Sequence, residues 1–132
     1  MGEHADFLDK ARESLAGAKS ELANGRHNNA ANRAYYACFQ AAVHALIGCS
    51  VKPPGADDQW RHDFVQARFT GDLINRRKRY SASLRSTLEK NARLRESADY
   101  NFEAVSKKEA LRAVERAEAF VTAVAAREGA LP

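Results

Sequence analysis

The sequence predicts an all-α protein, an up-and-down bundle of four long helices with one additional short helix. Apolar residues recur every three or four positions in four separate stretches, which is the period of an amphipathic helix. No stretch shows the alternation of apolar and polar residues that is typical of a β-strand. Short segments rich in Asn, Gly, Pro or Ser separate the stretches, and short connections favour antiparallel neighbours.

The composition is that of a soluble globular protein. A chain of 132 residues can form one domain over residues 1–132 and bury about two thirds of its unfolded surface. No apolar run reaches the length of about 20 residues that a membrane span needs, and the first residues do not resemble a signal peptide, so we expect a cytoplasmic protein. Cys38 and Cys49 would lie about 16 Å apart along one helix, too far for a disulfide.

The first helix is expected over residues 6–23. Its apolar residues follow helical spacing: Leu8, Ala11, Leu15, Ala18 and Leu22. Asn24 and Gly25 should end it, and a short polar link follows, in which His27 is expected to be an ordinary surface residue. The next helix should therefore pack antiparallel to the first.

The second helix is expected over residues 29–48, with Asn28 or Asn29 as its N-cap and Gly48 at its end. Its apolar residues spread over about half of the helix circumference, more than in an ordinary surface helix. They are Tyr35, Cys38, Phe39, Ala42, Val43 and Leu46. This helix should be the central, mostly buried element of the fold.

One polar strip runs along this central helix. Arg33, Ala37, Gln40 and His44 fall on nearly the same angle, because steps of seven and four residues return almost to one face. The strip is either a solvated edge or part of a binding cleft that Arg33, Gln40 and His44 line.

Three further elements complete the prediction. Residues 49–55 contain prolines and a glycine that cannot continue a helix, and a short helix is expected over residues 57–69. A long helix is expected over residues 72–97, with a seam formed by Leu73, Tyr80, Leu84, Leu88, Asn91, Leu94 and Ala98. Ser106 and Glu109 form a capping box, so the last helix should begin at Lys107.

Positive charge is concentrated in one segment. The chain carries a net charge of +4, yet residues 61–95 contain ten Lys or Arg against three acidic residues. Such a segment can bind phosphates or an acidic protein surface, or it can be a solvated face. The candidate phosphate-binding residues are Arg76, Arg77, Arg79 and Arg85.

Two segments carry a resemblance to a known family. The sequence Asn-Arg-Ala-Tyr-Tyr-Ala over residues 32–37, followed by Phe39, resembles the signature helix of HEPN domains. The sequence Leu-Arg-Glu-Ser-Ala-Asp-Tyr over residues 94–100 is similar to the second signature of one bacterial and archaeal branch of that family.

The resemblance implies two classes of function. Similar small HEPN proteins are frequently paired with a minimal nucleotidyltransferase in toxin–antitoxin or defence systems, and often form homodimers. Catalytic HEPN proteins are metal-independent ribonucleases that carry an Arg, four to six residues, and then a His. The Arg stabilises the phosphate transition state while the His moves protons.

The ribonuclease spacing is absent from this sequence. Arg95 is followed after four residues by Tyr100, and none of the four histidines follows an Arg at the required distance. Tyr is a poor base at neutral pH because its ordinary pKa is about 10. The related branch tends to place a His at the start of the short helix, so His62 is expected either to face the central cleft or simply to pack beside Trp60.

The predicted function is therefore a non-catalytic module. It would bind a nucleotidyltransferase partner, as a homodimer or a hetero-oligomer, together with a nucleotide or RNA. The alternative is a divergent metal-independent ribonuclease that uses Arg95 with Tyr100 or His62. The sequence shows no zinc-ligand spacing and no Gly-rich phosphate loop, so we expect no cofactor and no metal.

Overall fold

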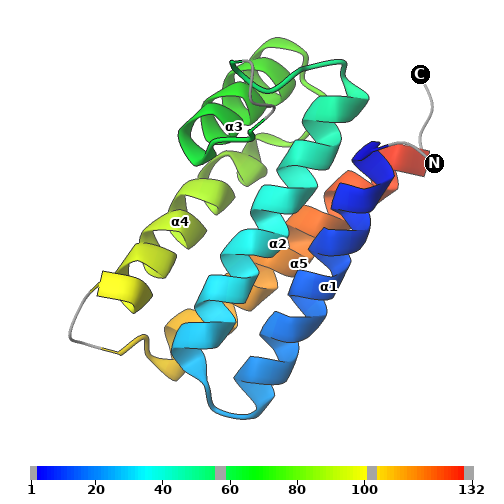
Figure 1. The fold of residues 1–132 in the computed structure, drawn as a ribbon. Coiled ribbons are helices and arrows are strands. Elements are labelled where there is room, and N and C mark those ends of the chain that lie inside the picture. Colours follow the sequence, from blue (N-terminus) through cyan, green and yellow to red (C-terminus); the bar gives the residue numbers. More distant parts are fainter. Residues whose placement is uncertain (1–2, 56–58, 101–103, 130–132) are drawn as a thin grey trace.

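The computed structural model describes residues 3–55, 59–100 and 104–129, and its regular elements in these ranges are all helical (Figure 1). The four long helices are α1 (Glu3–Ala23), α2 (His27–Gly48), α4 (Arg85–Tyr100) and α5 (Lys107–Gly129). Between α2 and α4 lie the short helix α3 (His62–Arg68), the π-helical segment η1 (Phe69–Arg76) and the 3-10 turn η2 (Ala82–Leu84). Successive long helices run in opposite directions (Figure 1), which confirms the predicted up-and-down bundle.

Helix α2 is the central element, as predicted. It contacts α1, α4 and α5 as well as the short α3, and in Figure 1 it runs through the middle of the bundle. Six of its alanines are fully buried: Ala30, Ala31, Ala34, Ala37, Ala41 and Ala42. Their small side chains let the neighbouring helices approach closely. Because helices of the same chain cover the wide apolar arc, that arc is no evidence for a second subunit.

The polar strip of α2 is not a solvated edge, so that interpretation is wrong. Ala37 is buried, and His44 is only 2% exposed. The Gln40 side-chain amide hydrogen-bonds the hydroxyl of Ser14 on α1 at 2.7 Å. Arg33 is exposed but its aliphatic stem passes beside Gly17 of α1. Within this strip, Arg33 and Gln40 contact α1, and Ala37 and His44 are buried.

The start of α2 also differs from the prediction. The helix begins at His27, and neither Asn28 nor Asn29 caps it, because Arg26 occupies the N-cap position without a side-chain bond. The Asn28 side chain instead accepts a hydrogen bond of 2.8 Å from the backbone N–H of Val105. Asn28 therefore joins the start of α2 to the segment that leads into α5.

The bounds of the helices predicted over residues 57–69 and 72–97 are wrong. Helix α3 begins only at His62, and the chain continues from it directly into η1. This continuation buries Phe69, Leu73 and Ile74 in the core. The break falls later, after η1, where Lys78 adopts a left-handed conformation with φ of 53°. Helix α4 then starts at Arg85. The predicted leading aspartates of the short helix lie outside the described residues.

The capping box of α5 is confirmed. Glu109 N–H donates to the Ser106 hydroxyl at 3.1 Å, and Ser106 N–H donates to the Glu109 carboxylate at 3.0 Å. These bonds hold the pKa of Glu109 below its usual value. Both cysteines are free thiols, as expected. In the described ranges no helix has the length and apolar character of a membrane span.

Candidate functional site: the Tyr35 cluster

Two residues that are far from Tyr35 in the sequence contact its ring on α2. The His62 ring, at the start of α3, stacks on Tyr35 with a centroid distance of 5.3 Å and on Phe39 with 4.5 Å. The Arg95 guanidinium, from α4, lies 5.0 Å from the centre of the Tyr35 ring. We call His62, Tyr35 and Arg95 the Tyr35 cluster. It joins α2, α3 and α4 on one side of the bundle.

Tyr35 itself is 2% exposed, and its hydroxyl forms a hydrogen bond with His62 Nδ1. Burial raises the pKa of the Tyr35 phenol, and the positive charge of Arg95 opposes this only in part. Tyr35 is therefore a neutral phenol at physiological pH. It positions His62 and does not act as a base.

His62 is suited to change its protonation state. Burial of its ring, foremost, and the charge of Arg95 lower the pKa of His62, while Asp63 opposes this shift. The imidazole is therefore neutral at neutral pH. Because a hydroxyl can donate or accept, Tyr35 can hold the ring in either tautomer, and the second nitrogen, Nε2, can serve as donor or acceptor.

Arg95 uses only part of its hydrogen-bonding capacity. Its Nη1 lies 3.3 Å from the Asp99 carboxylate, one helical turn away, so the two side chains form an ion pair. Its side chain is only 20% exposed, and its Nε is enclosed without a hydrogen-bond partner among the described residues. A guanidinium with an unsatisfied donor is a natural partner for an anionic oxygen.

A second cation adjoins the cluster through Tyr36. The Tyr36 ring lies edge-on to both Tyr35 and His62, with centroid distances of 5.4 and 6.1 Å. The Arg33 guanidinium lies over the Tyr36 ring, 5.2 Å from its centroid. The aromatic rings of this region thus lie between two arginines. In such an arrangement the rings can stack on a nucleic-acid base and the guanidinium groups can bind phosphate.

The family comparison agrees with this architecture. The family model of the HEPN domain matches residues 4–128, nearly the whole chain. The chain belongs to the HEPN domain family. No curated protein matches it significantly.

The HEPN fold brings together only some of the predicted site residues. His62 and Arg95 meet at Tyr35, and Arg33 lies next to them. Gln40 hydrogen-bonds Ser14 of α1, and His44 is buried, so neither belongs to the Tyr35 cluster. Tyr100 is the last residue of α4, and its side chain lies outside the described part of the protein. His62 stacks on Phe39, while Trp60 packs against Phe64.

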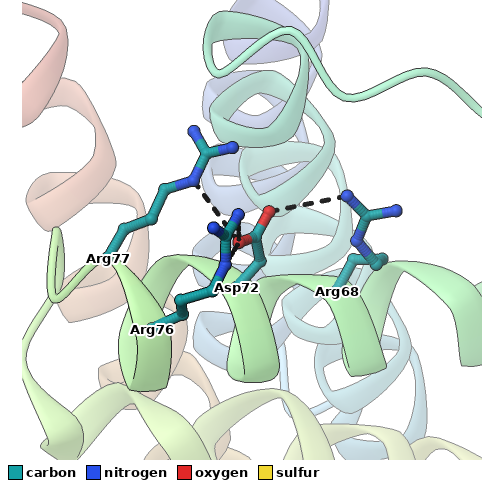
Figure 2. A network of polar contacts seen from close by, with 4 residues as sticks. All are labelled: Arg68, Asp72, Arg76 and Arg77. Atoms are coloured by element: carbon teal, nitrogen blue, oxygen red, sulfur yellow. Dashed lines mark hydrogen bonds and ion pairs between the residues drawn. The ribbon is translucent and has the colours of Figure 1, made fainter.

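Two of the candidate phosphate-binding arginines, Arg76 and Arg77, form a separate group with Arg68 around Asp72. Figure 2 shows Arg68, Arg76 and Arg77 converging on the Asp72 carboxylate, which is 6% exposed. Arg76 hydrogen-bonds Asp72 through Nε at 2.6 Å, and Arg77 and Arg68 lie at 3.3 and 3.5 Å. Three guanidinium groups share one carboxylate, so the group keeps a net positive charge.

The remaining two predicted arginines are placed differently. Arg85 donates to the side-chain oxygen of Asn75 at 2.7 Å and stays exposed. Arg79 is half-buried, with an enclosed Nε. In the described ranges no group of three His, Cys, Asp or Glu side chains could hold a metal ion.

Sequence reasoning missed the role of Tyr35 within this HEPN site. Helical periodicity placed Tyr35 correctly in the buried arc, but it does not show where a buried hydroxyl finds its partner. A buried Tyr hydroxyl needs such a partner, and in the fold His62 supplies it. That requirement was the available signal.

Proposed function

We propose that this HEPN protein is a cytoplasmic, non-catalytic module that binds phosphate groups of RNA or a nucleotide at the Tyr35 cluster. The supporting observation is that the Arg95 guanidinium, paired with Asp99 through Nη1, lies beside the neutral imidazole of His62, both held against Tyr35. Arg95 supplies charge and a fork of donors, and His62 Nε2 supplies a further donor. The rings of Tyr36 and His62 offer stacking surfaces for a base.

The geometry favours binding over cleavage. Hydrolysis of a phosphodiester through a 2′-hydroxyl needs one group to remove a proton and one to protonate the leaving oxygen. Within the described part of the cluster, His62 is the one side chain whose ordinary pKa lies close to neutral, and burial lowers that pKa, whereas the pKa of Tyr35 is raised. A single proton-transfer group supports recognition more readily than complete catalysis.

Ribonuclease activity is the second candidate function. The observation in its favour is that a neutral His and an Arg with unused donors lie on one Tyr ring, the two residue types that metal-free RNA cleavage uses. In this case Arg95 would stabilise the transition state and His62, with Tyr100 as the alternative, would move the proton.

Both candidates are tested with one set of variants. Replacement of Arg95 by Gln should weaken binding of a single-stranded RNA about tenfold, because one charge-assisted contact is lost. His62→Ala should weaken RNA binding less than Arg95→Gln does at neutral pH. Its effect should grow at acidic pH, because protonation of His62 adds a charge to the wild-type site. Fluorescence anisotropy at fixed salt measures both effects.

The matched control is Arg12→Gln, which removes an exposed α1 arginine paired with Asp9. Equal weakening by Arg12→Gln and Arg95→Gln would contradict a binding site at the Tyr35 cluster. RNA cleavage by the parent that disappears in Arg95→Gln, His62→Ala and Tyr100→Phe would establish the ribonuclease instead. Cleavage that survives all three substitutions would indicate a contaminating nuclease.

We also propose that the module works with a minimal nucleotidyltransferase in a toxin–antitoxin or defence system, as a homodimer or as a hetero-oligomer. Membership of the HEPN family supports this proposal. Analytical ultracentrifugation should detect species heavier than the 14.6 kDa monomer, for the chain alone or mixed with a nucleotidyltransferase encoded beside it. A 14.6 kDa species in both samples would contradict the proposal.

A further inference from the structure

A groove between α4 and α5 gathers cations on the side of α4 away from the Tyr35 cluster. Its volume is about 330 Å³, and its charged lining residues are Lys90, Arg93, Arg112, Arg116 and Glu109. With about 100° per residue, positions 90, 93 and 94 share one face of α4, whereas Arg95 lies on the opposite face. The groove is therefore separate from the Tyr35 cluster.

The charges of this groove are unbalanced. Four cations line it against one carboxylate, and the Glu109 carboxylate is already engaged by the backbone N–H of Ser106 in the capping box. Arg93 pairs with Glu89, but both side chains are exposed and water and salt screen such a pair. The remaining positive potential favours an anion.

A buried asparagine orients one of these cations. Asn91 is fully buried, and its Nδ2 donates to the carbonyl oxygen of Ala113 at 3.2 Å. Its Oδ1 accepts a hydrogen bond of 2.8 Å from Arg116 Nε. The nitrogen and the oxygen of the Asn91 amide are both hydrogen-bonded to α5. The amide therefore fixes the plane of the Arg116 guanidinium.

This anchoring leaves the outer edge of the guanidinium for a ligand. Arg116 Nε is used by Asn91, and the described residues provide no acceptor for its two Nη groups. Arg112 lies one turn before Arg116 on the same face of α5. Partial burial, foremost, and the repulsion between these two cations lower the pKa of Arg116, although the group stays charged. A dianion between them would relieve this repulsion.

We propose that the α4–α5 groove is a second ligand site, which binds the phosphate group of a nucleotide-sized molecule. Arg116 provides a fixed fork of donors, and Arg112 and Lys90 provide further charge around the phosphate. Leu94 supplies an apolar lining for the rest of the ligand. The volume lies at the lower end of the range for small-molecule pockets.

The test uses adenosine 5′-monophosphate, inorganic phosphate and a ten-nucleotide single-stranded RNA as probes, added to the full chain. The Arg116 Nε–H resonance in a nitrogen-15 NMR spectrum should shift in a saturable manner with the mononucleotide. Arg116→Gln and Arg112→Gln should each weaken mononucleotide affinity at least tenfold, and Arg116→Lys should weaken it less because it keeps the charge. Arg12→Gln should leave the affinity unchanged.

The Arg95→Gln variant separates this site from the proposed function. Saturable binding that persists in Arg95→Gln and disappears in Arg112→Gln supports the groove, whatever happens at the Tyr35 cluster. Competition by the RNA in the Arg95→Gln background would identify a polynucleotide as the source of the phosphate, and its absence would identify a free nucleotide. Loss of the Arg116 shift in Arg95→Gln, equal weakening by Arg12→Gln and Arg112→Gln, or no saturation with any probe would overturn the proposal.

Discussion

Replacement of Tyr35 by Asp should lower the free energy of unfolding by about 3–5 kcal/mol, since it removes a buried ring and leaves a carboxylate in an enclosed site. The ring contacts that are lost involve Phe39 and His62, at 6.1 and 5.3 Å between centroids. Urea unfolding followed by circular dichroism measures the change. An unfolding free energy close to that of the parent would show that Tyr35 is not buried in solution.

Tyr35→Phe is the matched control for this substitution. It keeps the ring and removes the hydroxyl, so the expected loss is about 1 kcal/mol, the typical net value of one hydrogen bond. NMR titration of the His62 ring reports separately on the lost hydrogen bond with Nδ1. A loss as large as that of Tyr35→Asp would mean that the hydroxyl, and not ring packing, dominates the stability of the cluster.

The fold was predictable because the core imposes one period on each long helix. Helices α1, α2 and α5 begin and end within a few residues of the positions that apolar spacing and breakers predicted. The error over residues 57–97 has the same origin. Leu73, Leu84 and Leu88 are all buried and keep helical spacing across the break, because η1 and α4 pack on the same core. Periodicity therefore could not detect the interruption at Lys78.

The site was predictable only in part. Resemblance pointed to His62 and Arg95, and both lie on Tyr35. A helical wheel shows which residues share a face, but it does not show which element covers that face. This is why Gln40 and His44 were included, although Gln40 hydrogen-bonds Ser14 of α1 and His44 is buried. The contact between Asn91 and Arg116 depends on how α4 packs on α5, which no local pattern encodes.

The sequence also did not reveal that Asp72 is the shared ion-pair partner of several arginines. Arg76 and Arg77 were predicted as phosphate-binding residues, yet both contact this one carboxylate, together with Arg68 (Figure 2). Burial disfavours the ionised form of Asp72, but the hydrogen bond and charge of Arg76, with Arg77 and Arg68, outweigh it and lower the pKa of Asp72. The carboxylate therefore stabilises the turn between η1 and α4 while it is ionised.

Replacement of Asp72 by Ala should accordingly lower the melting temperature at pH 7 on the order of 5 °C, because three guanidinium groups lose their shared acceptor and repel one another. The pKa is lower in the folded state than in the unfolded state, so the stabilisation is complete above the ordinary pKa of about 4 and is lost as the pH falls through the lower folded value. The difference in melting temperature between parent and Asp72→Ala should therefore shrink on acidification. Asp9→Ala, which removes an exposed partner of Arg12, should change the melting temperature little at either pH. A difference for Asp72→Ala that stays constant from neutral to strongly acidic pH would show that side-chain packing, and not the ionised carboxylate, accounts for the effect.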